Sequence, residues 1–247
     1  MSLACPSMFA DGFPDLCRAV DHYCERTSPA FDAEPVNAVT NGAFLLGAWL
    51  CWRLSAAQSN PAAAGMIKAL IVAMTTVGLG SFLFHTLGTR WAEWGDVIPI
   101  LIFMLLYLWF ILTRLLCWPG RQSLIVLGVF FFATFYLEAA APGDFLWGGA
   151  LFIPTIVSLA AIGLSLRLTG HAARHAMLGA ILVFFCTFTA RTLDHIICPI
   201  FPLGTHFFWH LLNATLLYLF VRLAILYAVP TEIRPAPRGR PANDPTL

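Results

Sequence analysis

Charge is scarce in this sequence of 247 residues, and lysine is nearly absent. Asp, Glu, Lys and Arg make up 11% of the residues, which is roughly half of what soluble globular domains carry. The 14 basic residues balance 13 acidic ones and leave a net charge of +1, so no basic surface for nucleic acid is expected. Lys68 is the only lysine, which argues against a retinal protein, because retinal needs a lysine in its pocket.

Hydrophobic residues make up 59% of the chain and form seven apolar runs. Each run is close to the ~20 residues that a helix needs to cross a bilayer. Residues 1–10 lack the features of a cleavable signal peptide, so the first run is expected to direct membrane insertion. The sequence predicts an all-α, polytopic membrane protein with seven transmembrane helices. The predicted spans are Pro35–Trp52, Ala62–His85, Gly95–Leu116, Ser123–Ala140, Phe145–Leu166, Ala176–His195 and Thr205–Ala228.

Three regions follow from this pattern. Residues 1–34 are acid-rich and are expected outside the cytoplasm, with a short helix around Pro14–Tyr23. Residues 35–229 form the transmembrane domain, and the Pro- and Arg-rich residues 230–247 are expected to be a disordered cytoplasmic tail. Basic residues favour the cytoplasmic side. An external N-terminus and a cytoplasmic C-terminus leave few basic residues outside, namely Arg18, Arg26, Arg90 and Arg191.

Polar and ionisable residues interrupt the apolar runs at positions that agree in depth. Such side chains are costly in hydrocarbon and mark a functional site by default. With the N-terminus outside, all of them fall in the outer part of the membrane, at the ends of the second and sixth spans and the starts of the third and seventh. They are Ser81, His85, Asp96, Arg191, Asp194, His195, His206 and His210.

The spacing of three of these histidines suits a metal ion. His206 and His210 are four residues apart, so both rings project from one face of a helix, and His85 is predicted at the same depth. Three histidines leave one position open on a tetrahedral zinc ion, as in catalytic sites. Asp96 is then a candidate general base for an activated water. The Ser81 hydroxyl is a candidate donor to a developing oxyanion.

Each residue taken alone has a simpler interpretation. A single His-x3-His pair is more often interfacial and bonded to carbonyls, Ser81 suits helix packing, and Asp96 could cap the third span. Arg191 and Asp194 are candidates for supporting the metal ligands, but they could instead pair with each other. The agreement of the whole set in depth favours a metal site.

Three blocks of the sequence resemble the alkaline ceramidases, within a wider superfamily of seven-helix membrane hydrolases that includes the adiponectin receptors. The first block is YCERTSPAFDAEPVNAVTN, at Tyr23–Asn41. The second combines Ser81-x3-His85 with Asp96, and the third runs from Asp194-x3-Cys198 to His206-x3-His210. The resemblance extends from about Asp21 to Ala228. It implies that the three histidines bind zinc, that Asp96 activates the water and that Ser81 supports the oxyanion.

The resemblance also implies a disulfide and a second metal site in the N-terminal segment. Cys24 and Cys198 match a bonded pair, and the predicted topology places both outside, where disulfides form; Cys5 and Cys17 fall outside as well and offer another pairing. Glu25 and Glu34 match acidic ligands of a calcium ion. The sequence departs from the family there, because His22 and Thr27 stand where Asp and Asn are usual, and calcium takes six or more oxygens.

These observations together predict a zinc-dependent intramembrane amidohydrolase. It would split the N-acyl bond of ceramide or a ceramide-like lipid into a fatty acid and a sphingoid base, with a membrane lipid as partner, zinc as cofactor and calcium as a second candidate ion. The alternatives are an acyl hydrolase of another membrane lipid on the same fold, acting on an acyl-amino lipid or a phospholipid, and a non-enzymatic seven-helix receptor. An Arg- and Ala-rich, Lys-poor composition is typical of GC-rich bacterial genomes and predicts an inner-membrane protein whose site faces the periplasm.

Overall fold

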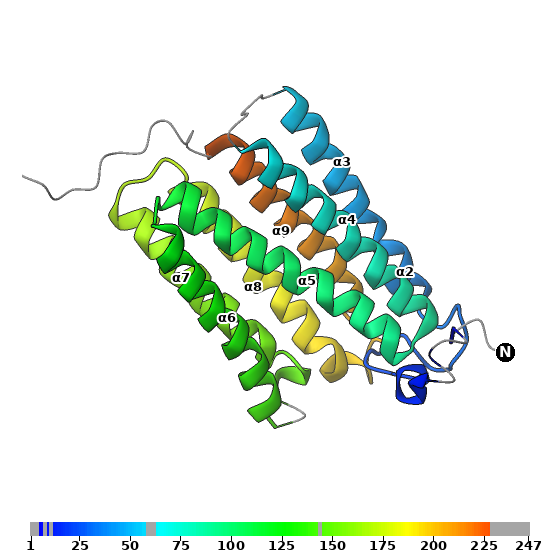
Figure 1. The fold of residues 1–247 in the computed structure, drawn as a ribbon. Coiled ribbons are helices and arrows are strands. Elements are labelled where there is room, and N and C mark those ends of the chain that lie inside the picture. The colour runs from blue at the N-terminus through cyan, green and yellow to red at the C-terminus, as the bar shows by residue number, and fades with distance from the viewer. Residues whose placement is uncertain (1–4, 7–8, 10–11, 58–62, 143–144, 228–247) are drawn as a thin grey trace, which may run out of the picture.

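The chain folds into a helical bundle (Figure 1). The computed structural model describes residues 5–6, 9, 12–57, 63–142 and 145–227. Within these ranges the only strand-like pairing is an isolated bridge between Ala19 and Thr89. The predicted tail at 230–247, and Ala62 and Ala228 at the ends of two predicted spans, lie outside the described residues. The prediction of an all-α membrane protein is confirmed by the apolar helices that follow.

Six helices are long and apolar enough to cross a membrane. Two shorter helices, α2 and α3, precede these six. They meet at Asn41, whose backbone is still helical with φ −64° and ψ −18°, so residues 35–57 form one further helical stretch. Large apolar side chains cover outward faces such as that of α6, where Phe132 is 72% exposed, as expected of a surface that meets lipid. The helices are α2 Pro35–Thr40, α3 Gly42–Ala57, α4 Ala64–Leu87, α5 Arg90–Phe110 with the π-helical turn η2 Ile111–Leu115, α6 Gly120–Ala140, α7 Ile153–Leu168, α8 Arg174–Ile197 and α9 His206–Tyr227.

Two helix starts differ from the sequence prediction by five residues or more. Helix α5 begins at Arg90 rather than Gly95, because Gly88 takes a left-handed conformation with φ 54° and Thr89 is extended, which reverses the chain within two residues. Asp96 therefore lies in the second turn of α5 and does not cap it. Helix α7 begins at Ile153 rather than Phe145, after the 3-10 turns η3 Phe145–Trp147 and η4 Ala150–Phe152.

The N-terminal segment also has less helix than predicted. Its regular structure is the 3-10 turn η1 Pro14–Cys17, after which the chain runs along the loop between α4 and α5, where the Val20 N–H donates to the Gly88 carbonyl at 2.8 Å. Figure 1 shows this segment at the end of the bundle where α4 ends and α5 begins. The segment thus covers the end of the bundle that carries the polar residues.

Small residues bring α4 and α5 into backbone contact. A Cβ added to Gly80 would overlap the carbonyl oxygen of Gly95 and would lie 3.4 Å from the Cα of Asp96. Close approach through small residues is the usual means of helix association in membranes. This contact places the last turns of α4, which carry Ser81 and His85, directly beside Asp96.

Candidate metal centre and active site

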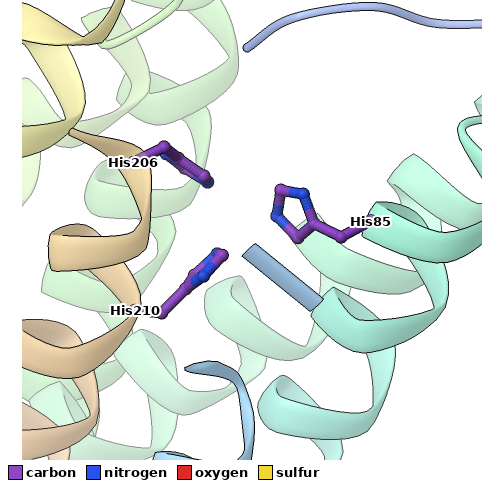
Figure 2. A group of neighbouring side chains, drawn as sticks. All are labelled: His85, His206 and His210. Carbon is purple, nitrogen blue, oxygen red and sulfur yellow. The ribbon is translucent and has the colours of Figure 1, made fainter. Parts of the chain in front are cut away.

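His85, His206 and His210 meet at one point between α4 and α9 (Figure 2). Each ring offers one nitrogen, and the three nitrogens lie within 4.8 Å of one another. The ring centroids are separated by 4.6 to 5.1 Å. All three side chains are buried, with at most 2% of each residue exposed. The fold therefore brings together His85 and His206, which are 121 positions apart in the chain, as the sequence pattern predicted.

The second nitrogen of two rings is already engaged. Nδ1 of His85 lies 2.6 Å from Oε2 of Glu34, and Nδ1 of His210 lies 2.9 Å from Oγ1 of Thr40. Because the Thr40 hydroxyl is also within 3.0 Å of the Val36 and Asn37 carbonyls, to which it donates, its oxygen accepts the His210 N–H. Both rings thus carry the proton on Nδ1 and direct a lone pair on Nε2 toward the shared point.

His206 is held by contacts on two sides. The ring of Tyr23 stacks on it with a centroid separation of 3.5 Å. The buried carboxylate of Asp194 accepts the backbone N–H groups of Thr205 at 2.6 Å and His206 at 2.8 Å, a negative charge at the start of α9 where the helix dipole favours one. The second oxygen of Asp194 accepts the Cys24 N–H at 2.9 Å. Asp194, predicted to support the ligands, positions the helix that carries two of them.

The donor set fits a tetrahedral metal ion such as zinc. Nε2 of His85, Nε2 of His210 and Nδ1 of His206 are all buried and have no hydrogen-bond partner, whereas buried polar atoms in proteins almost always have one. A tetrahedral zinc ion needs nitrogens about 3.3 Å apart, and the three nitrogens here lie within 4.8 Å of one another. Three neutral imidazoles would leave a fourth position for water or substrate.

Asp96 and Ser81 lie beside this cluster. Ser81 is buried one helical turn before His85, and Asp96 is close enough to both residues to interact electrostatically with them. Oδ1 of Asp96 is buried without a hydrogen-bond partner. A carboxylate that is near the metal point but is not part of the ligand cluster is free to accept a proton from a water bound there.

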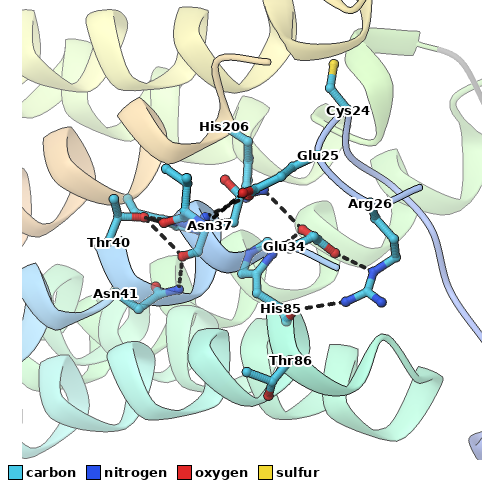
Figure 3. A network of polar contacts seen from close by, with 12 residues as sticks. Cys24, Glu25, Arg26, Glu34, Asn37, Thr40, Asn41, His85, Thr86 and His206 are labelled. Carbon is cyan, nitrogen blue, oxygen red and sulfur yellow. Dashed lines mark hydrogen bonds and ion pairs between the residues drawn. The ribbon is translucent and has the colours of Figure 1, made fainter. Parts of the chain in front are cut away.

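Glu34 connects the N-terminal segment to the metal point (Figure 3). Its carboxylate accepts hydrogen bonds from Nε of Arg26 at 2.5 Å, Nδ1 of His85 at 2.6 Å and Nδ2 of Asn37 at 3.1 Å. Burial by itself would raise the pKa of Glu34, but the hydrogen bond from His85 and the charge of Arg26 outweigh it and hold the pKa below its usual range. Glu34 is therefore an ionised partner of a histidine.

The predicted calcium site does not fit these residues. Both oxygens of Glu25 accept backbone N–H groups, from Val36 at 2.7 Å and Asn37 at 2.8 Å, and so cap the start of α2. Both oxygens of Glu34 bind protein donors, one of them the positively charged Arg26. A calcium ion would compete with these donors for the same oxygens. In the structure Glu25 caps the start of α2 and Glu34 supports His85.

The structure contains disulfides Cys24–Cys198 and Cys5–Cys17. The first joins the N-terminal segment to the α8–α9 connection beside Asp194. Gly204 makes room for this junction, because it has φ 65° and a Cβ there would overlap Oδ1 of Asp194. Arg191 lies with its guanidinium carbon 5.7 Å from the ring centre of Phe152 and 6.0 Å from that of Trp209.

Three residues of the site were missed by sequence reasoning. They are Tyr23 on His206, Thr40 on His210 and Arg26 on Glu34. All three lie in the first block, where the sequence analysis assigned roles only to the cysteine and the glutamates. The available signal was Arg26 itself, a basic residue directly after Cys24 and Glu25 in an otherwise acid-rich segment.

An apolar cavity lies inside the bundle, and its lining includes Trp209, whose ring stacks on that of His206 with a centroid separation of 6.5 Å. Trp209 and Asn213, which flank His210 on α9, line one end, and Phe220 and Tyr107 line the other. The remaining walls come from α5, α6, α7 and α8. Along α9 the lining runs from Trp209 to Phe220, twelve residues whose rise corresponds to roughly 16 Å. The arrangement offers an elongated apolar group a binding site whose lining includes two neighbours of His210 on α9.

Comparison with known proteins supports the resemblance inferred from the three sequence blocks. A family model described as Ceramidase matches residues 20–238, a range that includes all the residues of the site described above. A search of curated proteins and a search of solved structures found no match.

Proposed function

Because the chain belongs to the ceramidase family, we propose that it hydrolyses the N-acyl bond of ceramide or a ceramide-like lipid at a zinc ion held by His85, His206 and His210. The products would be a fatty acid and a sphingoid base. The observation that carries the proposal is the convergence of three buried imidazoles with partnerless nitrogens in a bundle that also holds an apolar cavity lined by Trp209 and Asn213 of the same helix α9. The family supports hydrolysis of ceramide, and the cluster supports dependence on a metal.

The proposed chemistry assigns one task to each residue. A zinc ion bound by three histidines acts as a Lewis acid and makes water nucleophilic near neutral pH. Asp96 accepts the proton of the attacking water and later delivers it to the amine that leaves, because an amide nitrogen departs poorly without a proton. The Ser81 hydroxyl donates to the acyl oxygen as negative charge develops on it. Glu34 and Thr40 keep two of the ligand rings in the required tautomer.

The cavity accounts for a lipid substrate. An acyl chain that extends from the metal point toward Tyr107 would be surrounded by apolar side chains of five helices, while its carbonyl carbon lies at the histidines. A substrate with such tails does not leave the bilayer, which gives a reason for placing the site among transmembrane helices. A receptor would need the cavity but would have no need of partnerless histidine nitrogens at its end.

The test combines metal analysis with lipid turnover on purified protein. We expect one zinc per chain and release of fatty acid from N-acyl lipids, both of which His206→Ala should abolish. His175→Ala is the matched control, because His175 is exposed outside the cluster, and it should retain both. Zinc retained by His206→Ala would contradict the ligand assignment. Cleavage of ester lipids but not of amides would favour the other acyl hydrolases.

A further inference from the structure

Arg26 is a buried charge at the edge of the metal centre. Only 6% of the residue is exposed. Its guanidinium donates to four oxygens, which are Oε1 of Glu34 at 2.5 Å, the His85 carbonyl at 2.9 Å, and the carbonyls of Ser28 and Ala30 at 3.4 Å each. Figure 3 shows Arg26 between the Glu34 carboxylate and the end of α4.

This set of acceptors has the composition of a cation site. One carboxylate and three backbone carbonyls are the type of ligands that a hard cation takes. The planar guanidinium group donates hydrogen bonds to these acceptors, because its N–H groups point in several fixed directions. The resemblance to the ceramidases implies a calcium ion in this segment, yet the Glu25 oxygens cap α2 and the Glu34 oxygens are taken. The positive charge in this segment is supplied by the chain itself.

The contacts of Arg26 lead directly to a metal ligand. Arg26 binds Glu34, and Glu34 accepts the N–H of His85, so the guanidinium holds the acceptor that orients this ring. It also binds the backbone carbonyl of His85. The chain closes tightly around it, because a Cβ at Gly88 would lie 2.7 Å from the guanidinium carbon. Arg26 therefore contacts the side-chain partner and the backbone of the same ligand.

We propose that Arg26 is a positioning residue that takes the place of a bound calcium ion, fixing Glu34 against His85 so that the metal centre assembles without calcium. The inference rests on the proposed metal site. It makes two statements that can be measured without substrate: the protein does not respond to calcium, and Arg26 influences the metal through Glu34.

The first measurement is thermal unfolding of the purified full chain with added calcium or, as control, magnesium. A cation that binds the folded state raises its unfolding temperature. We expect no rise with calcium and no stoichiometric calcium in elemental analysis. A calcium-specific rise, or one bound calcium per chain, would overturn the proposal even if the protein proves to hydrolyse lipids.

The second measurement is zinc affinity, by competition with a chelator, together with the absorption spectrum of the cobalt-substituted protein. Loss of a partner that orients a metal ligand typically weakens metal binding by about 10- to 100-fold, and we expect this for Arg26→Gln and for Glu34→Gln, with an altered cobalt spectrum. Arg18→Gln, an exposed arginine of the same segment, should match the wild type.

The double variant Arg26→Gln/Glu34→Gln distinguishes positioning from general stabilisation. If Arg26 acts through Glu34, the double variant should bind zinc about as weakly as Glu34→Gln alone, because the two effects are not additive within one network. It also removes both charges together, so it remains measurable if Arg26→Gln fails to fold. Additive losses, or wild-type zinc affinity in Arg26→Gln, would overturn the proposal.

Discussion

At the scale of single residues, the site depends on what the histidines do with their second nitrogen. Glu34 and Thr40 each accept an Nδ1–H, and this leaves Nε2 of both rings without a partner inside the protein. A desolvated imidazole nitrogen without a partner is unfavourable, and a bound metal ion removes that cost. The same contacts that complete the hydrogen bonding of the segment Glu34–Thr40 therefore prepare the rings for a metal.

Asp96→Asn should separate proton transfer from metal binding. The amide keeps the size of the carboxylate but cannot accept the proton, so turnover of an N-acyl lipid should fall by about 10²- to 10⁴-fold. Zinc content should stay at the wild-type level, because Asp96 is not part of the histidine cluster. Asp15→Asn, in the exposed η1 turn, is the control. Near wild-type turnover would exclude Asp96 as the base, and loss of zinc would make it a ligand.

At the scale of helices, the contact between α4 and α5 sets the distance between the histidine and carboxylate sides of the site. Gly80 faces the Gly95 carbonyl without room for a side chain. The α4–α5 loop reverses in two residues, and the Gly80–Gly95 contact places Ser81 at the level of Asp96, with His85 one helical turn nearer the loop. The geometry of the site therefore depends on Gly80, which has no side chain and takes no part in the reaction.

Gly80→Ala should weaken the fold and slow the reaction together. The added methyl overlaps backbone rather than a flexible side chain, and overpacking of this kind costs about 1–3 kcal/mol. Thermal unfolding and lipid turnover should both decline. Gly179→Ala in α8 is the matched control, since nothing lies within 4 Å of its added Cβ, and it should be neutral or stabilising. Full activity of Gly80→Ala would show that the α4–α5 distance is not critical.

Tyr107 should limit the length of the acyl chain. Its ring stacks on Phe220 with a centroid separation of 4.3 Å, and both line the end of the cavity away from the histidines. In Tyr107→Ala the preference should shift toward longer chains. Because one methylene in an apolar pocket is worth about 1–3 kcal/mol, the ratio of kcat/KM for long over short chains should rise at least about tenfold.

Two further variants separate the floor of the cavity from other effects. Tyr107→Phe keeps the ring and removes a hydroxyl that is buried without a partner, so it should retain the wild-type preference. Tyr136→Ala removes a tyrosine that is 72% exposed on α6 and should not change it. An unchanged preference in Tyr107→Ala would place the acyl chain elsewhere.

At the scale of the whole molecule, the N-terminal segment closes one end of the bundle over the site. Tyr23, Arg26 and Glu34 reach the ligands from it, and the Cys24–Cys198 bond fastens it to the end of α8. Burial raises the pKa of the Tyr23 phenol, so this ring stays uncharged against His206. The segment at 1–34 and the bundle at 35–229, which the sequence treats as separate regions, share one site.

The topology proposed from the basic residues, with the N-terminus outside, can be tested by thiol labelling in intact cells. An impermeant reagent should reach Cys24 and Cys198 only after reduction of their disulfide. Cys117, in the connection between η2 and α6, is a free thiol at the other end of the bundle and should stay unlabelled until the cells are opened. Labelling of Cys117 in intact cells, with Cys24 protected even after reduction, would reverse the orientation.

The sequence by itself determined the membrane class, the approximate spans and the depth of the polar residues, because hydropathy and helical spacing are local properties of the chain. His206 and His210 share a helix face through spacing alone, and the depth of His85 follows from the length of its span. The boundaries at Arg90 and Ile153 were misplaced. Helix α5 starts earlier than predicted because residues 90–94 are helical although they are not part of an apolar run. Helix α7 starts later because Leu146 and Gly148 have positive φ angles within a run that stays apolar.

Only the tertiary structure decided which partner each polar group takes. Glu34 and His85 are 51 residues apart, and Thr40 and His210 are 170 apart, so no local pattern relates them. The resemblance to the ceramidases implies that Glu25 and Glu34 bind calcium, although His22 and Thr27 depart from the family's pattern. In the fold Glu25 accepts N–H groups at the start of α2, and Glu34 accepts hydrogen bonds from Arg26 and His85. Buried N–H groups and charges need such acceptors because water is excluded.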